Sequence, residues 1–217
     1  MERRKILFDE KEYEYKLYYK NIKSLYIRFV NGEIIVSAPF YTDLSVIESF
    51  LLMNKEKLLD RIENYVPYIG EDYVYLFGER CSLVIVSSKR NECIIKNHSL
   101  YVYSLNYKTT LEKYLLELLY SYISQRVDYY IERYHIPRPL INIKYYKSKW
   151  GCCYIYKNKV VYNKVLVHLD KKLIDYVIVH ELCHFKEKGH NQRLYSLIEE
   201  SIPDYKECIE KLKGCHT

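Results

Sequence analysis

Glycine, proline and long apolar runs are scarce in this sequence of 217 residues. It has six glycines and five prolines, which excludes collagen-like repeats and long flexible linkers. No window of about 18 uninterrupted apolar residues occurs, so we expect no membrane-spanning segment. The first ten residues are largely charged and lack an apolar core, which argues against a secretory signal. The seven cysteines are odd in number and suggest no disulfide framework, so we expect free thiols and a cytoplasmic location.

Apolar and aromatic residues are abundant enough for a folded core. Hydrophobic residues make up 49% of the sequence, and 27 residues are tyrosine. A chain of this length can bury such a core without disulfides or metal ions to hold it together. These features favour a globular protein with one large or two small domains.

The first half of the sequence predicts mostly strands. Short runs rich in aromatic and β-branched residues lie at 13–19, 24–30 and 33–38, and Asn31-Gly32 is typical of a hairpin turn between the last two. One helix is predicted from about residue 43 to 65, and short strands follow up to residue 103. We therefore expect a β-rich N-terminal subdomain with one helix at residues 1–107.

The second half predicts mainly helices. A long helix beginning at Thr109 or Thr110 is followed by a strand at 141–146 and a hairpin around 157–158. Further helices are predicted near residues 171–187, 192–201 and 204–213. The whole is an α+β fold, with a mainly helical domain at residues 108–217.

The net charge of +6 lies entirely in the second half. Residues 1–107 contain 15 basic and 15 acidic residues, whereas residues 108–217 contain 19 and 13. The stretch 138–172 holds nine basic residues and one acid, Asp170, with aromatic residues interleaved. Such a stretch can attract a polyanion and stack bases, although a solvated lysine-rich strand has the same composition. An anionic or nucleic-acid partner therefore stays open.

Residues 180–184 contain the motif H-E-x-x-H, and a third histidine, His190, follows six residues later. On a helix, His180 and His184 lie one turn apart and point the same way, so both imidazoles can bind one metal ion. Glu181 lies beside them and can hold a metal-bound water without binding the metal. Three histidines leave the fourth position of tetrahedral zinc open, as a catalytic site requires.

Two residues are predicted to bound the helix that carries this motif. Asp170 is a plausible N-cap, and Gly189 can adopt the left-handed conformation that ends helices. A turn after Gly189 would bring His190 to the ion. Glu199 or Glu200 on the next helix is the competing third ligand, but His190 is closer in sequence and chemically sufficient.

The remaining reactive side chains near the motif are interpreted as structural or solvated. Glu187 is expected to be a solvated carboxylate near the helix end. Cys183 and the adjacent pair Cys152-Cys153 are expected to be structural thiols, since no second pair of cysteines or histidines has zinc-site spacing.

With these residues in view, the sequence resembles the YgjP-like metallopeptidase-domain family, a relative of SprT-like and metzincin-like zincins. The likeness covers nearly the whole chain. Besides the third-ligand turn His190-Asn191, the matching segments are the N-terminal strands with Ser37–Pro39, and Ser148–Cys153, Val160–Asn163, Asp175–His184 and Pro203–Tyr205. Cys152 and Leu194-Tyr195 depart from the family pattern, which usually has Ser and a bulkier Phe-Trp-like pair there. The resemblance implies a zincin-like metallopeptidase core with a metal-dependent hydrolase site.

The sequence therefore predicts a zinc-dependent hydrolase, and a metallopeptidase in particular. His180, His184 and His190 are predicted to bind one Zn²⁺ per chain. Glu181 is predicted to be the catalytic base, which takes a proton from the metal-bound water and passes it to the leaving amine. A peptide or protein is the expected substrate, and no membrane is expected to take part.

The sequence leaves three points open. Tyr195, Tyr162 and Lys149 are candidates for a further donor to the oxyanion, and the sequence does not choose among them. The substrate could instead be a nucleotide, or a protein held on nucleic acid. A different class of function is a nucleic-acid-binding module with purely structural zinc, which a fourth protein ligand would indicate.

Overall fold

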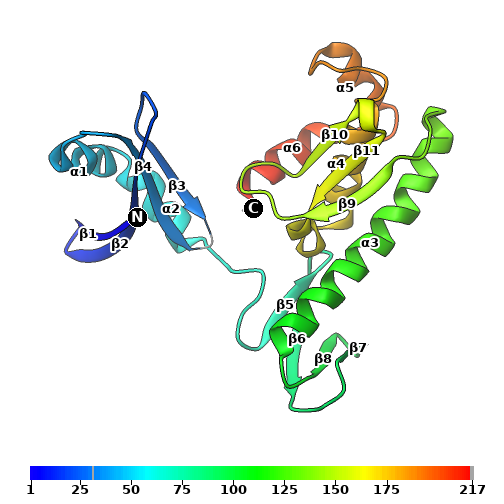
Figure 1. The fold of residues 1–217 in the computed structure, drawn as a ribbon, viewed down its shortest axis with the longest axis horizontal. Coiled ribbons are helices and arrows are strands. Elements are labelled where there is room, and N and C mark those ends of the chain that lie inside the picture. Colours follow the sequence, from blue (N-terminus) through cyan, green and yellow to red (C-terminus); the bar gives the residue numbers. More distant parts are fainter. Residues whose placement is uncertain (31, 216–217) are drawn as a thin grey trace. The chain divides into compact units, whose positions relative to one another are not determined.

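The structure is a computed structural model that describes residues 1–30 and 32–215. The chain divides into two compact units, Met1–Pro67 and Tyr68–Thr217. The first unit is a four-stranded sheet with two helices (Figure 1). Its elements are β1 (Glu2–Phe8), β2 (Lys11–Lys20), β3 (Tyr26–Val30), β4 (Glu33–Pro39), α1 (Leu44–Met53) and α2 (Lys55–Glu63). The strand order is β1-β2-β4-β3, with β2 and β4 parallel and the other neighbours antiparallel.

Local details of this unit differ from the sequence prediction. The charged strand β1 was not predicted, because its apolar signal consists of little more than Ile6 and Phe8, which are buried. The predicted helix is divided into α1 and α2 at Asn54. The predicted turn at Asn31-Gly32 falls partly outside the described residues, which omit Asn31, but β3 and β4 do pair as antiparallel neighbours.

The second unit contains two sheets and most of the helices. A four-stranded sheet has the order β5-β6-β8-β7, and a three-stranded sheet has the order β10-β11-β9. The elements are β5 (Tyr73–Leu76), β6 (Glu79–Val86), β7 (Glu92–Lys96), β8 (Ser99–Tyr103), α3 (Tyr107–Tyr134), β9 (Leu140–Lys144), β10 (Gly151–Tyr154), η1 (Ile155–Lys157), β11 (Lys159–Asn163), η2 (Lys164–His168), α4 (Lys171–Cys183), α5 (Gln192–Glu199) and α6 (Tyr205–Gly214). The mixed α+β class, with a β-rich first half, is as predicted.

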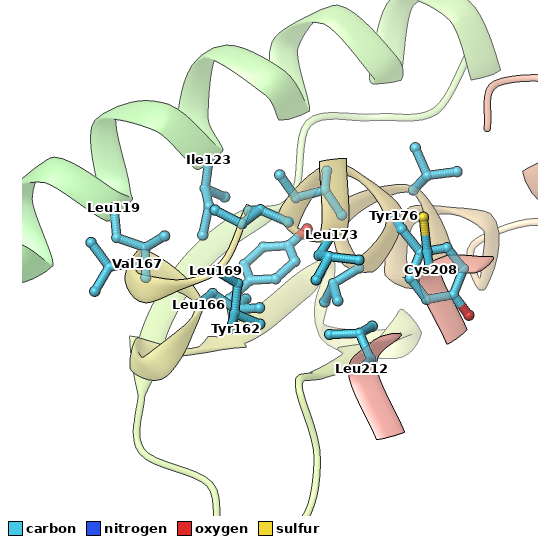
Figure 2. Close-up of a cluster of buried hydrophobic side chains, with 14 of the residues drawn as sticks. Leu119, Ile123, Tyr162, Leu166, Val167, Leu169, Leu173, Tyr176, Cys208 and Leu212 are labelled. Atoms are coloured by element: carbon cyan, nitrogen blue, oxygen red, sulfur yellow. The ribbon is translucent and has the colours of Figure 1, made fainter. Parts of the chain in front are cut away.

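The long helix α3 holds the second unit together. It contacts β7 and β8 of the first sheet in this unit, β9 of the other sheet, and also η2 and α4 (Figure 1). Figure 2 shows Leu119 and Ile123 of α3 pointing toward Val167 and Leu169 within one buried cluster. Burial of these side chains holds η2 and the segment before α4 against α3, at about 1.5–3 kcal/mol for each large apolar side chain.

The compact units do not follow the division expected at residues 107 and 108. The four-stranded sheet β5–β8 belongs with the helices, because its inward side chains share a core with α3. Leu100 and Val102 of β8 are fully buried in the same cluster as Leu111 and Leu115 of α3. The boundary between residues 107 and 108 was predicted from the change from strands to helices and from the shift in charge. Neither feature indicates which surfaces pack together.

Within the described part of the chain, we find no helix with both the length and the apolarity needed to cross a bilayer. All seven cysteines are free thiols, as the sequence predicts.

Candidate metal centre

The helix that carries the H-E-x-x-H motif is α4, which is buried on nearly every side. Nine of its 13 residues are buried, which explains its nearly continuous apolar sequence. The helix begins after Asp170 in the N-cap position, as predicted. Its start therefore lies where the local sequence predicts it, while its burial on nearly every side is a consequence of the surrounding elements.

The end of α4 differs from the prediction. The helix ends at Cys183, with His184 as its C-cap, rather than near residue 187. The chain continues in a tighter, 3₁₀-type turn, in which the Phe185 amide donates to the Leu182 carbonyl oxygen at 3.0 Å, three residues earlier. Gly189 is not left-handed, and the described glycines with positive φ lie elsewhere. The helix therefore stops before Gly189 is needed as a terminator.

The structure brings His180, His184 and His190 together. One ring nitrogen from each lies within 4.8 Å of those of the other two, and the Nε2 atoms of His180 and His190 are 3.2 Å apart. His180 comes from the last turn of α4, His184 is the C-cap of that helix, and His190 comes from the segment before α5. Three imidazole nitrogens that converge on one point match the donor set and number of a catalytic zinc site.

The other ring nitrogens of two histidines have partners. Nδ1 of His184 lies 3.0 Å from the Glu187 carbonyl oxygen, to which its N–H can donate. Nδ1 of His180 lies 3.5 Å from the Tyr176 hydroxyl. Such contacts leave Nε2 of each ring free to bind a metal. Burial lowers the pKa of His184 and lowers that of His180 to about 4, so both rings are held in the neutral state that metal binding requires.

Glu181 is buried where α4 meets β10, with only 6% of its surface exposed. Burial raises the pKa of its carboxyl to about 7, against the opposing effects of a Cys153 backbone hydrogen bond and the nearby charge of Lys149. Gly151 leaves the space that this side chain fills, since a Cβ on Gly151 would lie 2.6 Å from Glu181 Cγ. The carboxylate is thus held beside the histidines by β10.

A cavity of about 630 Å³ opens over these groups. Residues of β10 and of the loop before it form one wall, and residues of α6 form another. Helix α4 contacts both β10 and α6, and it contributes His180, Glu181 and Val177 to the lining. The sequence did not indicate the α6 wall, because Ile209 and Leu212 read only as the apolar side of a short amphipathic helix.

Asn163 forms hydrogen bonds that hold the loop before β10, part of the cavity wall, in place. Its fully buried side chain donates to the carbonyl oxygens of Tyr146 at 2.9 Å and Lys149 at 3.0 Å, and it accepts from the Val165 amide at 3.2 Å. The backbone amide of Asn163 donates to the Trp150 carbonyl oxygen at 2.8 Å. One residue at the end of β11 therefore sets the path of the chain that enters β10.

The three candidate oxyanion donors have different surroundings. Lys149 lines the cavity. Tyr162 is instead fully buried in the core, and Tyr195 stacks on Tyr205 with ring centroids 5.5 Å apart. The geometry therefore favours Lys149 among the three.

The alternative ligands lie apart from the histidines. Glu199 and Glu200 are exposed, and neither belongs to the metal-ligating group found among the described residues. The Glu187 carboxylate accepts from the Gly189 amide at 3.3 Å rather than standing fully solvated.

The cysteines near the motif are also placed. Cys183 is buried, and burial raises the pKa of its thiol to about 11. Cys152 and Cys153 line the cavity, which their sequence did not indicate. Burial raises the pKa of the Cys153 thiol to about 12, so this side chain is a neutral part of the wall.

The basic stretch 138–172 does not form a single strand face. Arg138 pairs with Asp128, and Lys164 pairs with Glu112, each at 2.5 Å. Lys157 lies in η1 and Lys159 begins β11, so these two lysines do not share a strand face. These separate arrangements weaken the case for a nucleic-acid-binding face.

Comparison with known proteins gives structural likenesses and one family. The chain is similar to the crystal structure of the metallopeptidase zymogen of Pyrococcus abyssi abylysin, with 17% identity, a TM-score of 0.39, and coverage of 42% of this chain and 90% of that one. It is also similar to the metallopeptidase zymogen of Methanocaldococcus jannaschii jannalysin, with 26% identity, a TM-score of 0.36, and coverage of 42% and 96%. No curated protein matches the chain significantly. The model of the YgjP-like metallopeptidase domain matches residues 23–214, so the chain belongs to this family of metal-dependent hydrolases.

Proposed function

We propose that this chain is a zinc-dependent peptidase in which His180, His184 and His190 hold the metal and Glu181 is the general base. The observation that carries this proposal is the convergence of three imidazole nitrogens beside a buried carboxylate in one cavity. Bound zinc supplies a water of lowered pKa and a Lewis acid for the substrate carbonyl. Three imidazoles without a fourth protein ligand among the described residues favour a catalytic over a structural ion.

Glu181 has the position and the pKa for proton transfer. A carboxyl with a pKa of about 7 can both accept and release a proton near neutral pH. In this role, a carboxylate oxygen of Glu181 takes a proton from the attacking water and later delivers it to the leaving nitrogen. The Cys153 amide, which donates to this carboxylate, holds it in one orientation.

Two further features of the cavity suit a peptide substrate. Among the described strands, β10 pairs with β11 alone, so its second edge keeps backbone groups that an extended peptide can pair with. Lys149, directly before β10, can donate to the oxygen of a carbonyl under attack. Apolar side chains from α4 and α6 provide contacts for substrate side chains.

The test is a screen of zinc-loaded protein against peptides, folded proteins and nucleotides, with Glu181→Gln as the control. We expect peptide cleavage by the wild type and loss of cleavage in Glu181→Gln, which should still contain zinc. Nucleotide hydrolysis without peptide cleavage would contradict the peptidase assignment. Full activity in Glu181→Gln would contradict the role of Glu181.

A further inference from the structure

The cavity at the candidate metal centre is lined by side chains of one predominant charge. Three lysines line it, Lys149, Lys188 and Lys213, and Glu181 is the carboxylate beside them. The proposed function assigns Glu181 to proton transfer. It assigns Lys149 to the oxygen of the carbonyl under attack, so the charges left to contact substrate side chains are the positive ones of Lys188 and Lys213.

Two of these lysines mark the two ends of the edge strand β10. Lys149 precedes the strand, and its Nζ lies 4.9 Å from the centroid of the Tyr146 ring. Lys188 donates to the Tyr156 hydroxyl at 3.1 Å, and Tyr156 follows the strand in η1. The Lys188 ammonium thus contacts a phenol and remains available to an anion, whereas the charge of Lys149 also acts on the nearby Glu181 carboxyl. A strand of four residues spans about 13 Å, roughly the length of four residues of extended peptide.

The third lysine lies on the α6 wall. Lys213 contacts the Glu210 carboxylate at 2.7 Å, and the two side chains are 65% and 70% exposed. Exposed pairs of this kind contribute little and exchange readily with another anion. Between the lysines the lining is apolar, with Trp150, Ile209 and Leu212 among its members.

We propose that this cleft selects peptides that carry acidic side chains on both sides of a central apolar residue. The inference rests on the proposed function, which supplies the cleavage. Lysines around an apolar surface attract aspartate and glutamate side chains, and they repel lysine and arginine at the same positions.

The first measurement compares three peptides that differ in charge alone. Each is acetylated and amidated, has the same apolar centre, and is flanked by glutamate, glutamine or lysine. For zinc-loaded wild type we expect kcat/KM to fall in that order, with glutamate over glutamine on the order of tenfold at low salt. The preference should shrink as salt rises, because exposed charges are screened. Binding of the same labelled peptides to zinc-loaded Glu181→Gln should follow the same order.

The second measurement assigns the preference to the cavity. Lys188→Glu and Lys213→Glu should each reduce the glutamate preference severalfold. Lys211→Glu is the matched control, because it makes the same charge change on an exposed residue of α6 outside the cavity lining. It should leave the preference unchanged. Zinc content and circular dichroism verify that each variant is folded.

The outcomes separate this inference from the proposed function. Equal cleavage and equal binding of the three peptides, with Glu181→Gln inactive, would overturn the charge selectivity and leave the peptidase intact. Charge-selective binding to Glu181→Gln without cleavage by the wild type would overturn the peptidase and leave the selectivity. If Lys211→Glu and Lys213→Glu reduce the glutamate preference equally, the preference is due to overall charge. That result would overturn the inference that the cavity lysines cause it.

Discussion

Gly151→Ala should separate the placement of Glu181 from the binding of metal. The new Cβ would lie 2.6 Å from Glu181 Cγ, 2.7 Å from Oε1 and 2.9 Å from Cδ. Carbon atoms in contact need about 3.5 Å, so the carboxylate has to move by roughly 1 Å. A displacement of that size at a reacting group costs about 10²-fold in rate. We therefore expect kcat to fall by about that factor while the zinc content stays unchanged.

The assay is cleavage of a peptide that the wild type turns over, together with metal analysis and thermal unfolding. Overpacking of this kind also destabilises the fold, by about 1–3 kcal/mol, so activity is compared well below the melting temperature. Gly214→Ala is the matched control, because a Cβ on Gly214 meets nothing within 4 Å. Near-normal kcat in a folded, zinc-containing Gly151→Ala variant would refute the idea that Gly151 sets the position of Glu181.

Three further predictions concern single residues of the site. His190→Ala should lose the bound zinc, as measured by metal analysis of purified protein, and unchanged zinc would instead point to Glu199 or Glu200 as the third ligand. Glu181→Gln keeps the size of the side chain but cannot accept the proton, so it should retain zinc and lose activity by about 10² to 10⁴; simultaneous loss of zinc would mean that Glu181 is a ligand or a structural group. Asn163→Ala leaves two carbonyl oxygens and one backbone amide without their partner, so denaturant unfolding should show a free energy of unfolding lower by about 3 kcal/mol. A change below about 0.5 kcal/mol, the size typical of a surface substitution, would contradict the idea that Asn163 holds the loop in place.

The clustering of His180, His184 and His190 is the part of the candidate site that the sequence predicts best. The spacing of His180 and His184 determines their shared direction through the geometry of one helical turn, whatever surrounds the helix. His190 follows after a segment too short to carry it far away. The family resemblance depends on these residues together with further segments such as Ser148–Cys153 and Val160–Asn163, and the match over residues 23–214 confirms it.

Where the predictions were wrong, the deciding contacts were distant in sequence. The strands β5–β8 join the helical unit because Leu100 and Val102 pack against α3, and no pattern within the strands names that partner. Helix α4 is an exception, because its end before Gly189 accompanies a local hydrogen bond from the Phe185 amide to the Leu182 carbonyl oxygen. Basic side chains of residues 138–172 form separate ion pairs with acids of α3, since Arg138 pairs with Asp128 and Lys164 with Glu112.

The sequence by itself determined the α+β class, the ends of several elements and the residues able to bind a metal, since these follow from periodicity and local spacing. Only the tertiary structure decided that Glu181 is buried against Gly151, that Lys149 rather than Tyr162 or Tyr195 lines the cavity, and that α6 forms a wall. These properties arise when segments far apart in the chain pack together. The burial of a side chain, the pKa of a carboxyl group and the charge of a cavity depend on all the groups that surround them in the folded chain. Local sequence does not specify those groups.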